Sequence, residues 1–136
     1  MKIEFTFYGE PTAKGRPRFT TRGRFPMAYT PAKTVAAENL FKLQSLRFKP
    51  QTPFTGPVIL TARIYRSIPK SFSVAKREQA LAGVLFPICR PDTDNFLKLI
   101  LDSMNGIFFK DDSQVYQISA IKLYSLNPRI EIDLEA

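Results

Sequence analysis

Apolar and polar residues alternate along several stretches of this chain, which predicts strands that bury one face. The clearest stretch is residues 2–8, and a second covers residues 58–66 with arginines among its polar positions. Two more strands are expected at about 114–124 and at 129–135. Since Asn127-Pro128 is a typical turn sequence, we expect these last two strands to pair as an antiparallel hairpin.

Other stretches repeat their apolar residues every three or four positions, which is typical of helices. Residues 31–48 are expected to form a helix capped by Thr30. Its apolar stripe would consist of Ala36, Leu40, Leu43 and Leu46. A short polar helix is expected over residues 74–81, and the clearest helix covers residues 94–105. The stripe of that helix would consist of Phe96, Leu97, Ile100, Leu101 and Met104.

A basic segment separates the first strand from the first helix. Residues 9–18 are expected to be a loop, because proline and glycine interrupt regular structure there. Residues 19–29 could form a short hairpin that displays Arg22 and Arg24 at its tip.

The order of the predicted strands and helices indicates one α+β domain over residues 1–136, in which helices pack on one face of a mixed sheet.

The charge of the chain is unevenly distributed. Its 136 residues contain 20 Lys and Arg against 12 Asp and Glu, which gives a net charge of +8. Residues 1–90 alone have a net charge of +12, whereas residues 91–136 have a net charge of −4. This division fits a protein that attracts a polyanion and holds a divalent cation against it. A solvated basic face with an acidic C-terminal segment would give the same count.

The chain contains no histidine and one cysteine, Cys89, which limits its chemistry. An internal disulfide, a zinc site with ordinary ligands and histidine-based catalysis are excluded. No apolar run is long enough for a membrane span, and the first residues do not form a signal peptide. We therefore expect a cytoplasmic protein whose catalysis, if any, uses carboxylates, lysines, hydroxyls or hard metal ions.

Asp92 and Asp94 are the first candidates for a metal site. In an extended segment, residues i and i+2 point to the same side, so both carboxylates could bind one hard cation. Pro91 favours an extended backbone in Arg90, the residue before it, and this supports an extended segment at the aspartates. The structural alternative for Asp94 is the N-cap of the helix that follows, whereas Asp92 has no comparable structural role.

A second acidic pair, Asp111-Asp112, follows the helix over residues 94–105. Its structural alternative is ordinary turn chemistry. We expect the loop after the helix to fold back and bring this pair toward Asp92 and Asp94, where a bound Mg²⁺ or Mn²⁺ would relieve their repulsion. Lys98 could bind a phosphate beside these carboxylates, and Asp102 is expected to orient it.

These residues form one longer pattern, in which Asp92-Thr93-Asp94-Asn95-Phe96-Leu97-Lys98 is followed by Asp102, Gly106 and Asp111-Asp112-Ser113-Gln114-Val115. The order and spacing are those of the motif D-x-D-N-x-x-K, an aspartate, a glycine and D-D-x-Q-[VI]. Residues 90–115 therefore resemble the RusA family of Holliday-junction resolvases. A looser likeness to phage- and prophage-type members lies in Lys14-Gly15-Arg16-Pro17-Arg18-Phe19, Tyr29-Thr30-Pro31 and Pro69-Lys70-Ser71.

The resemblance implies a Mg²⁺-dependent endonuclease, for which Mn²⁺ could substitute, that acts as a symmetric dimer and nicks opposing strands of a four-way DNA junction. Asp92, Asp94 and Asp112 match the essential metal-binding aspartates of the family, and Lys98 matches its essential lysine. Asp111 matches a secondary acid. Only one arginine, Arg90, precedes the motif, where some members have several.

Binding of a DNA junction requires a broad positive surface that contacts phosphates without reading sequence. The candidates in the basic segment and beside the motif are Lys14, Arg16, Arg18, Arg22, Arg24 and Arg90. Arg63 and Arg66 on the second strand rank below them, because a basic loop can wrap around DNA. Any of these side chains could instead be simply solvated.

Two other functions fit the same residues. The chain could be a non-catalytic DNA-binding accessory protein, whose acidic residues only cap a helix and form a turn. It could also be a flap or single-strand nuclease that uses the same carboxylates.

Overall fold

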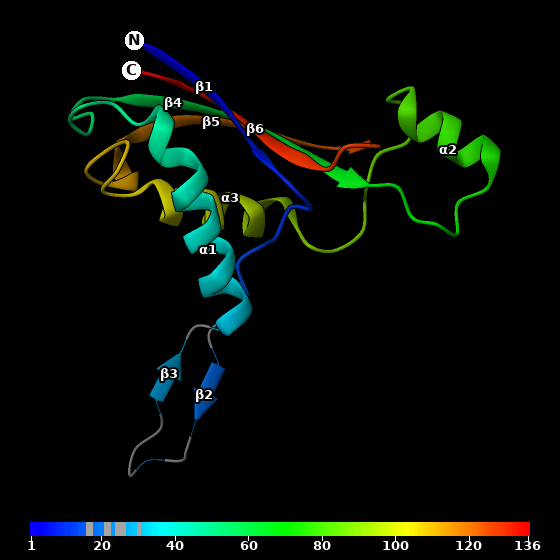
Figure 1. The fold of residues 1–136 in the computed structure, drawn as a ribbon, viewed down its shortest axis with the longest axis horizontal. Coiled ribbons are helices and arrows are strands. Elements are labelled where there is room, and N and C mark those ends of the chain that lie inside the picture. The colour runs from blue at the N-terminus through cyan, green and yellow to red at the C-terminus, as the bar shows by residue number, and fades with distance from the viewer. Residues whose placement is uncertain (16–17, 21–22, 24–26, 30) are drawn as a thin grey trace.

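The computed structural model describes residues 1–15, 18–20, 23, 27–29 and 31–136 (Figure 1). These residues form a single small α+β domain. The strands are β1 (Lys2–Tyr8), β2 (Arg18–Thr20), β3 (Met27–Tyr29), β4 (Val58–Ser67), β5 (Val115–Ser125) and β6 (Arg129–Glu135). The helices are α1 (Ala32–Ser45), η1 (Leu46–Phe48), α2 (Val74–Leu81), α3 (Thr93–Met104) and η2 (Asp112–Gln114).

The four long strands form one mixed sheet in the order β1-β6-β4-β5. Strand β6 is antiparallel to both β1 and β4, whereas β5 is parallel to β4. The expected hairpin between the last two strands is therefore wrong, because β5 and β6 lie on opposite sides of β4. Alternate residues of β4 are fully buried. This strand takes a central position, and the short connection over residues 126–128 passes from one of its neighbours to the other.

Helices α1 and α3 cover one face of the sheet, as expected (Figure 1). The core between them consists of alternate residues from β1, β4 and β6 together with aromatic side chains, among which the rings of Phe5 and Phe108 stack 5.3 Å apart. Helix α2 lies beyond the end of the sheet instead. Just before α2, the ring of Phe72 makes an edge-to-face contact with that of Tyr124 in β5, with 5.6 Å between the ring centres.

The apolar stripe predicted for the first helix does not face the core. In α1 the buried residues are Thr34, Phe41 and Ser45, while Leu40 and Leu43 are exposed. Phe41 determines this orientation, because its ring packs 5.1 Å from that of Phe7 in the core. The expected cap at Thr30 lies outside the described residues.

The expected hairpin in the basic segment is present. Strands β2 and β3 pair antiparallel, with Arg18 opposite Tyr29. Its proposed tip residues, Arg22 and Arg24, lie outside the described residues, as does Arg16.

Candidate functional site

Asp92 and Asp94 are positioned by the start of α3. Asp92 occupies the N-cap and Asp94 lies in the first turn, so the capping alternative considered for Asp94 is wrong and the capping position belongs to Asp92. The carboxylate of Asp92 makes no capping hydrogen bond, and both side chains are exposed. Because Asp94 is helical, the two residues do not form the expected extended pair. Both carboxylates nevertheless remain available at the N-terminal end of α3.

Lys98 lies one helical turn beyond Asp94 and is exposed. Residues separated by four positions share a helix face, so this ammonium group lies on the same side of α3 as Asp94. Among the described residues, Lys98 has no ion pair. It therefore remains available to bind an anion beside the aspartates.

Asp102 does not orient Lys98 as expected. Its carboxylate is instead bound by the ammonium group of Lys14, which also lies 3.7 Å from a carboxylate oxygen of Glu38. The hydrogen bond to Asp102 is the main reason that the pKa of Lys14 is raised above its ordinary value. Lys14 thus links the basic segment to α3 and α1, and its charge is already paired within the chain.

Asp111 and Asp112 lie in η2, just after the loop that ends α3. Asp111 forms a capping box, in which it accepts a bond of 3.1 Å from the backbone N–H of Ser113 and donates its own N–H to Gln114 over 2.9 Å. Hydrogen bonding by Ser113 lowers the pKa of Asp111. The turn chemistry considered above therefore accounts for Asp111. Asp112 takes no part in this capping box and is half-buried.

The two acidic pairs are at opposite ends of α3. At 1.5 Å per residue, its 12 residues span about 18 Å. The loop after α3 does not fold back toward the start of the helix, because Gln114 is tied to the carbonyl oxygens of Phe54 and Gly56 at the far end. Within the described part of the chain, no three acidic, cysteine or histidine side chains are close enough to hold a metal ion. The aspartates of the motif are thus not gathered at one point within the described part of a single chain.

Lys122 is a residue of this region that the sequence analysis missed. Its ammonium group donates to the carbonyl oxygen of Cys89 at 2.9 Å and to that of Pro91 at 3.0 Å. It thereby fixes the segment that presents Asp92. The available signal was a lysine within an otherwise uncharged strand, where a half-buried ammonium group needs hydrogen-bond acceptors.

A cavity of about 860 Å³ opens beside the N-terminal end of α3. Pro91 and Asn95, which flank the two aspartates, line it together with the cationic side chains of Lys14, Lys33 and Arg66. Arg66 is paired with Glu10 at 3.1 Å and lies 5.3 Å from the ring centre of Phe96. Because Lys14 and Arg66 are already paired with carboxylates, Lys33 is the cationic side chain of this lining that forms no ion pair among the described residues, and it could contact a phosphate backbone.

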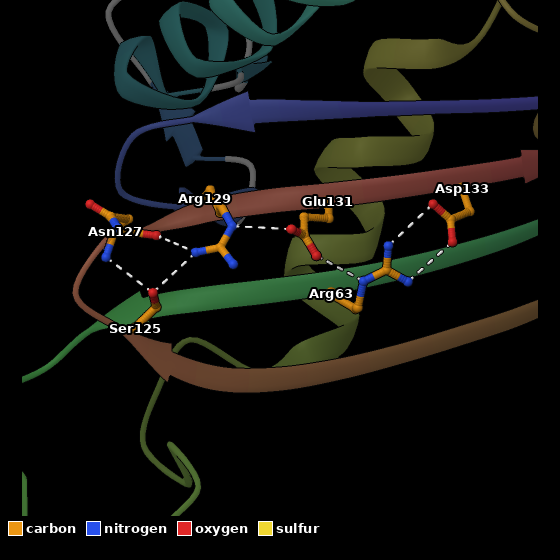
Figure 2. A network of polar contacts seen from close by, with 6 residues as sticks. All are labelled: Arg63, Ser125, Asn127, Arg129, Glu131 and Asp133. Atoms are coloured by element: carbon orange, nitrogen blue, oxygen red, sulfur yellow. Dashed lines mark hydrogen bonds and ion pairs between the residues drawn. The ribbon is translucent and has the colours of Figure 1, made fainter. Parts of the chain in front are cut away.

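The remaining basic candidates differ in their surroundings. Arg90 is exposed, and the backbone of Arg18 lies in β2. Arg63 is on the sheet face opposite α1 and α3, where its guanidinium binds Glu131 at 2.9 Å and Asp133 at 3.1 Å (Figure 2). These hydrogen bonds raise the pKa of Arg63 above its ordinary value, and the two carboxylates neutralise its charge within the sheet.

No helix in the described ranges is long and apolar enough to cross a membrane.

Two comparisons with known proteins bear on this site. The family model described as Endodeoxyribonuclease RusA matches residues 8–135, nearly the whole chain. The chain is also 41% identical over 132 residues to the uncharacterized protein YqaN of Bacillus subtilis strain 168, and the match covers 96% of this chain and 93% of that protein. The family match includes both ends of α3, where the aspartates lie.

Proposed function

Because this chain belongs to the RusA family of endodeoxyribonucleases, we propose that it is a Holliday-junction resolvase of DNA recombination and repair. It would nick two opposing strands of a four-way DNA junction, require Mg²⁺ or Mn²⁺, and act in the cytoplasm as a homodimer. The observation that supports this proposal best is the family match together with exposed Asp92 and Asp94 at the start of α3 and exposed Lys98 one turn beyond Asp94.

The described residues favour a role in binding and cutting a phosphate backbone. Lys98 has no intramolecular partner among them and would neutralise negative charge on a scissile phosphate. The cavity lined by Lys33 and Arg66 would hold a neighbouring part of the DNA backbone. Asp92, Asp94 and Asp112 remain the proposed metal ligands and Asp111 a secondary one, although one chain does not gather them.

A homodimer is part of this proposal for a reason of symmetry. A four-way junction presents two equivalent strands to be cut, and two subunits related by a two-fold axis present two equivalent sites. Sedimentation at micromolar protein concentration tests this element, and a monomer under nicking conditions would contradict it.

The deciding experiment is nicking of a synthetic four-way junction with and without Mg²⁺. We expect two symmetric nicks that require the ion, and a rate at least about 100-fold lower for Asp92→Asn with junction binding retained. The exposed acid of α2 provides the matched control, since Glu78→Gln removes one charge far from α3 and should leave the rate unchanged. Undiminished cutting by Asp92→Asn would contradict the assignment of this residue.

The same assay separates the two rival functions. An accessory protein would bind DNA in a salt-sensitive manner without any Mg²⁺-dependent nick. A flap or single-strand nuclease would cut those substrates faster than the junction, and equal cutting of linear duplex would remove the claim of selectivity.

A further inference from the structure

The carboxylate of Glu10 is held by two converging hydrogen-bond donors at the end of β4. It accepts from Nε of Arg66 at 3.1 Å and from the backbone N–H of Ser67 at 3.3 Å. The pairing of β4 with β6 ends at Tyr65, two residues before Ser67, so an acceptor outside the sheet can reach this N–H. A guanidinium and a backbone N–H are also donors by which proteins hold a phosphate.

This pair of donors belongs to the cavity of about 860 Å³ beside the start of α3. Glu10 and Arg66 both line it, together with Pro91 and Asn95, which flank the two aspartates. The guanidinium of Arg66 also packs on the ring of Phe96 in α3, 5.3 Å from the ring centre. An anion held by Arg66 would therefore lie in the same cavity as the backbone on either side of the aspartates.

The bond to Glu10 leaves much of the guanidinium unused. Arg66 has five N–H donors, and Glu10 accepts from one of them. Its Nη1 atom is buried without a hydrogen-bond partner among the described residues, whereas buried donors are normally paired. The side chain of Glu10 is 43% exposed, against 21% for Asp102 in its pair with Lys14. An ion pair this open to water is weak, so another anion can take the place of Glu10.

We propose that Arg66 is a phosphate-binding residue, and that a phosphate of DNA takes the place of Glu10 when the protein binds its substrate. The carboxylate of Glu10 then turns into solvent, while Arg66 and the N–H of Ser67 donate to phosphate oxygens. That the phosphate belongs to DNA rests on the proposed function. In the free protein, Glu10 both holds the guanidinium in position and competes with the phosphate for it.

The salt dependence of binding tests the contact of Arg66 with a phosphate. Affinity for a four-way junction is measured without Mg²⁺, so that no cutting occurs, at several NaCl concentrations. Each neutralised phosphate contributes about 0.9 to the slope of log K against log salt, so Arg66→Met should reduce this slope by about that amount. Arg63→Met is the matched control, because it removes the same charge from the opposite sheet face, where two carboxylates already bind it (Figure 2).

Thermal unfolding first verifies that both arginine variants are folded. Arg63→Met should keep the slope of the wild type. An Arg66→Met protein with that same slope would overturn the phosphate contact.

Glu10→Gln tests the exchange without removing a cation. A glutamine competes less for the guanidinium, so this variant should bind the junction about 3- to 5-fold more tightly than the wild type. The control is Glu4→Gln, which removes an exposed acid from β1 and should leave the affinity unchanged. Equal or weaker binding by Glu10→Gln would mean that Glu10 only supports Arg66, and would overturn the exchange.

Nicking in Mg²⁺ reports on the proposed function separately. If both binding results are as expected and the wild type makes no nick, the exchange is supported and the proposed function is contradicted. If the wild type nicks the junction while both variants bind like their controls, the exchange is overturned and the proposed function is retained.

Discussion

The ammonium group of Lys14 is bound to the carboxylate of Asp102, although 88 positions separate the two residues in the chain. The backbone around Lys14 is fixed as well. Its N–H donates to the carbonyl oxygen of Asn95 at 3.0 Å, and the N–H of Gly15 donates to the hydroxyl of Thr34 at 2.9 Å. The base of the basic segment is therefore attached to both helices that cover the sheet. Lys14 thus holds the start of this segment in place against α1 and α3.

Loss of the Lys14 ion pair should destabilise the fold. Both side chains are partly buried, and a hydrogen bond between charged groups contributes about 1.5–3 kcal/mol. We expect Lys14→Met and Asp102→Asn each to lower the free energy of unfolding by about 1–2 kcal/mol in urea denaturation. The control is Lys2→Met, which breaks an exposed pair with Glu4 and should have no measurable effect. Additive losses in the double variant would show that the two residues do not interact.

A fall in pH should weaken the ion pairs of Arg63 and Glu131 on the sheet face opposite α1 and α3. Burial alone would raise the pKa of Glu131, but hydrogen bonds from Arg63 and Arg129 outweigh it and lower this pKa below the ordinary 4.5. The resulting stability is present above the unfolded pKa and is lost as pH falls through the lower folded pKa. Glu131→Gln should therefore be less stable than wild type near neutral pH, and the difference should shrink below about pH 4.

Urea denaturation across this pH range measures the effect on the network. The matched control is Glu135→Gln, which removes an exposed carboxylate from the same strand. Its stability difference from wild type should stay nearly constant with pH. A Glu131→Gln variant with the same flat profile would contradict the linkage.

Lys122 should act as a positioning residue for Asp92. We expect Lys122→Met to release the carbonyl oxygens of Cys89 and Pro91 and to slow junction nicking by about 10–100-fold, the usual effect of removing a residue that orients a site. The Mg²⁺ concentration needed for half-maximal rate should rise. Lys122→Arg retains a donor and should restore part of the rate, whereas Lys70→Met, at an exposed turn, should have none of these effects. A normal Mg²⁺ requirement in Lys122→Met would exclude a positioning role.

Local periodicity predicted most of the elements of this fold. The strand over residues 2–8 and the helix beginning near Asp94 were found because each buries one face against a core. The neighbours of each strand were not predictable in the same way. Alternation in residues 129–135 shows that a strand exists, but β4 separates it from β5 through contacts distant in sequence. The orientation of α1 was missed for a similar reason, because Phe41 competes with several leucines for the core.

The residues of the candidate site stay a prediction, whereas the arrangement expected for them differs from the one in the structure. The resemblance to the family motif singled out Asp92, Asp94 and Asp112. The capping position of Asp92 and the placement of Asp112 at the far end of α3 depend on how the helix packs. Likewise, Lys14 and Lys122 find their partners through tertiary contacts, which spacing within a segment does not reveal.

The placement of β1 next to β6 has a consequence for synthesis. In the sheet order, β1 has β6 as its strand neighbour, and the register pairs Lys2 with Glu135. Ile3, Phe5 and Phe7 therefore have no strand to shield them until residues 129–135 have been translated. Contacts of such long sequence separation form slowly, and exposed apolar strands aggregate. The nascent chain should thus be most prone to aggregate before β6 is available to pair with β1.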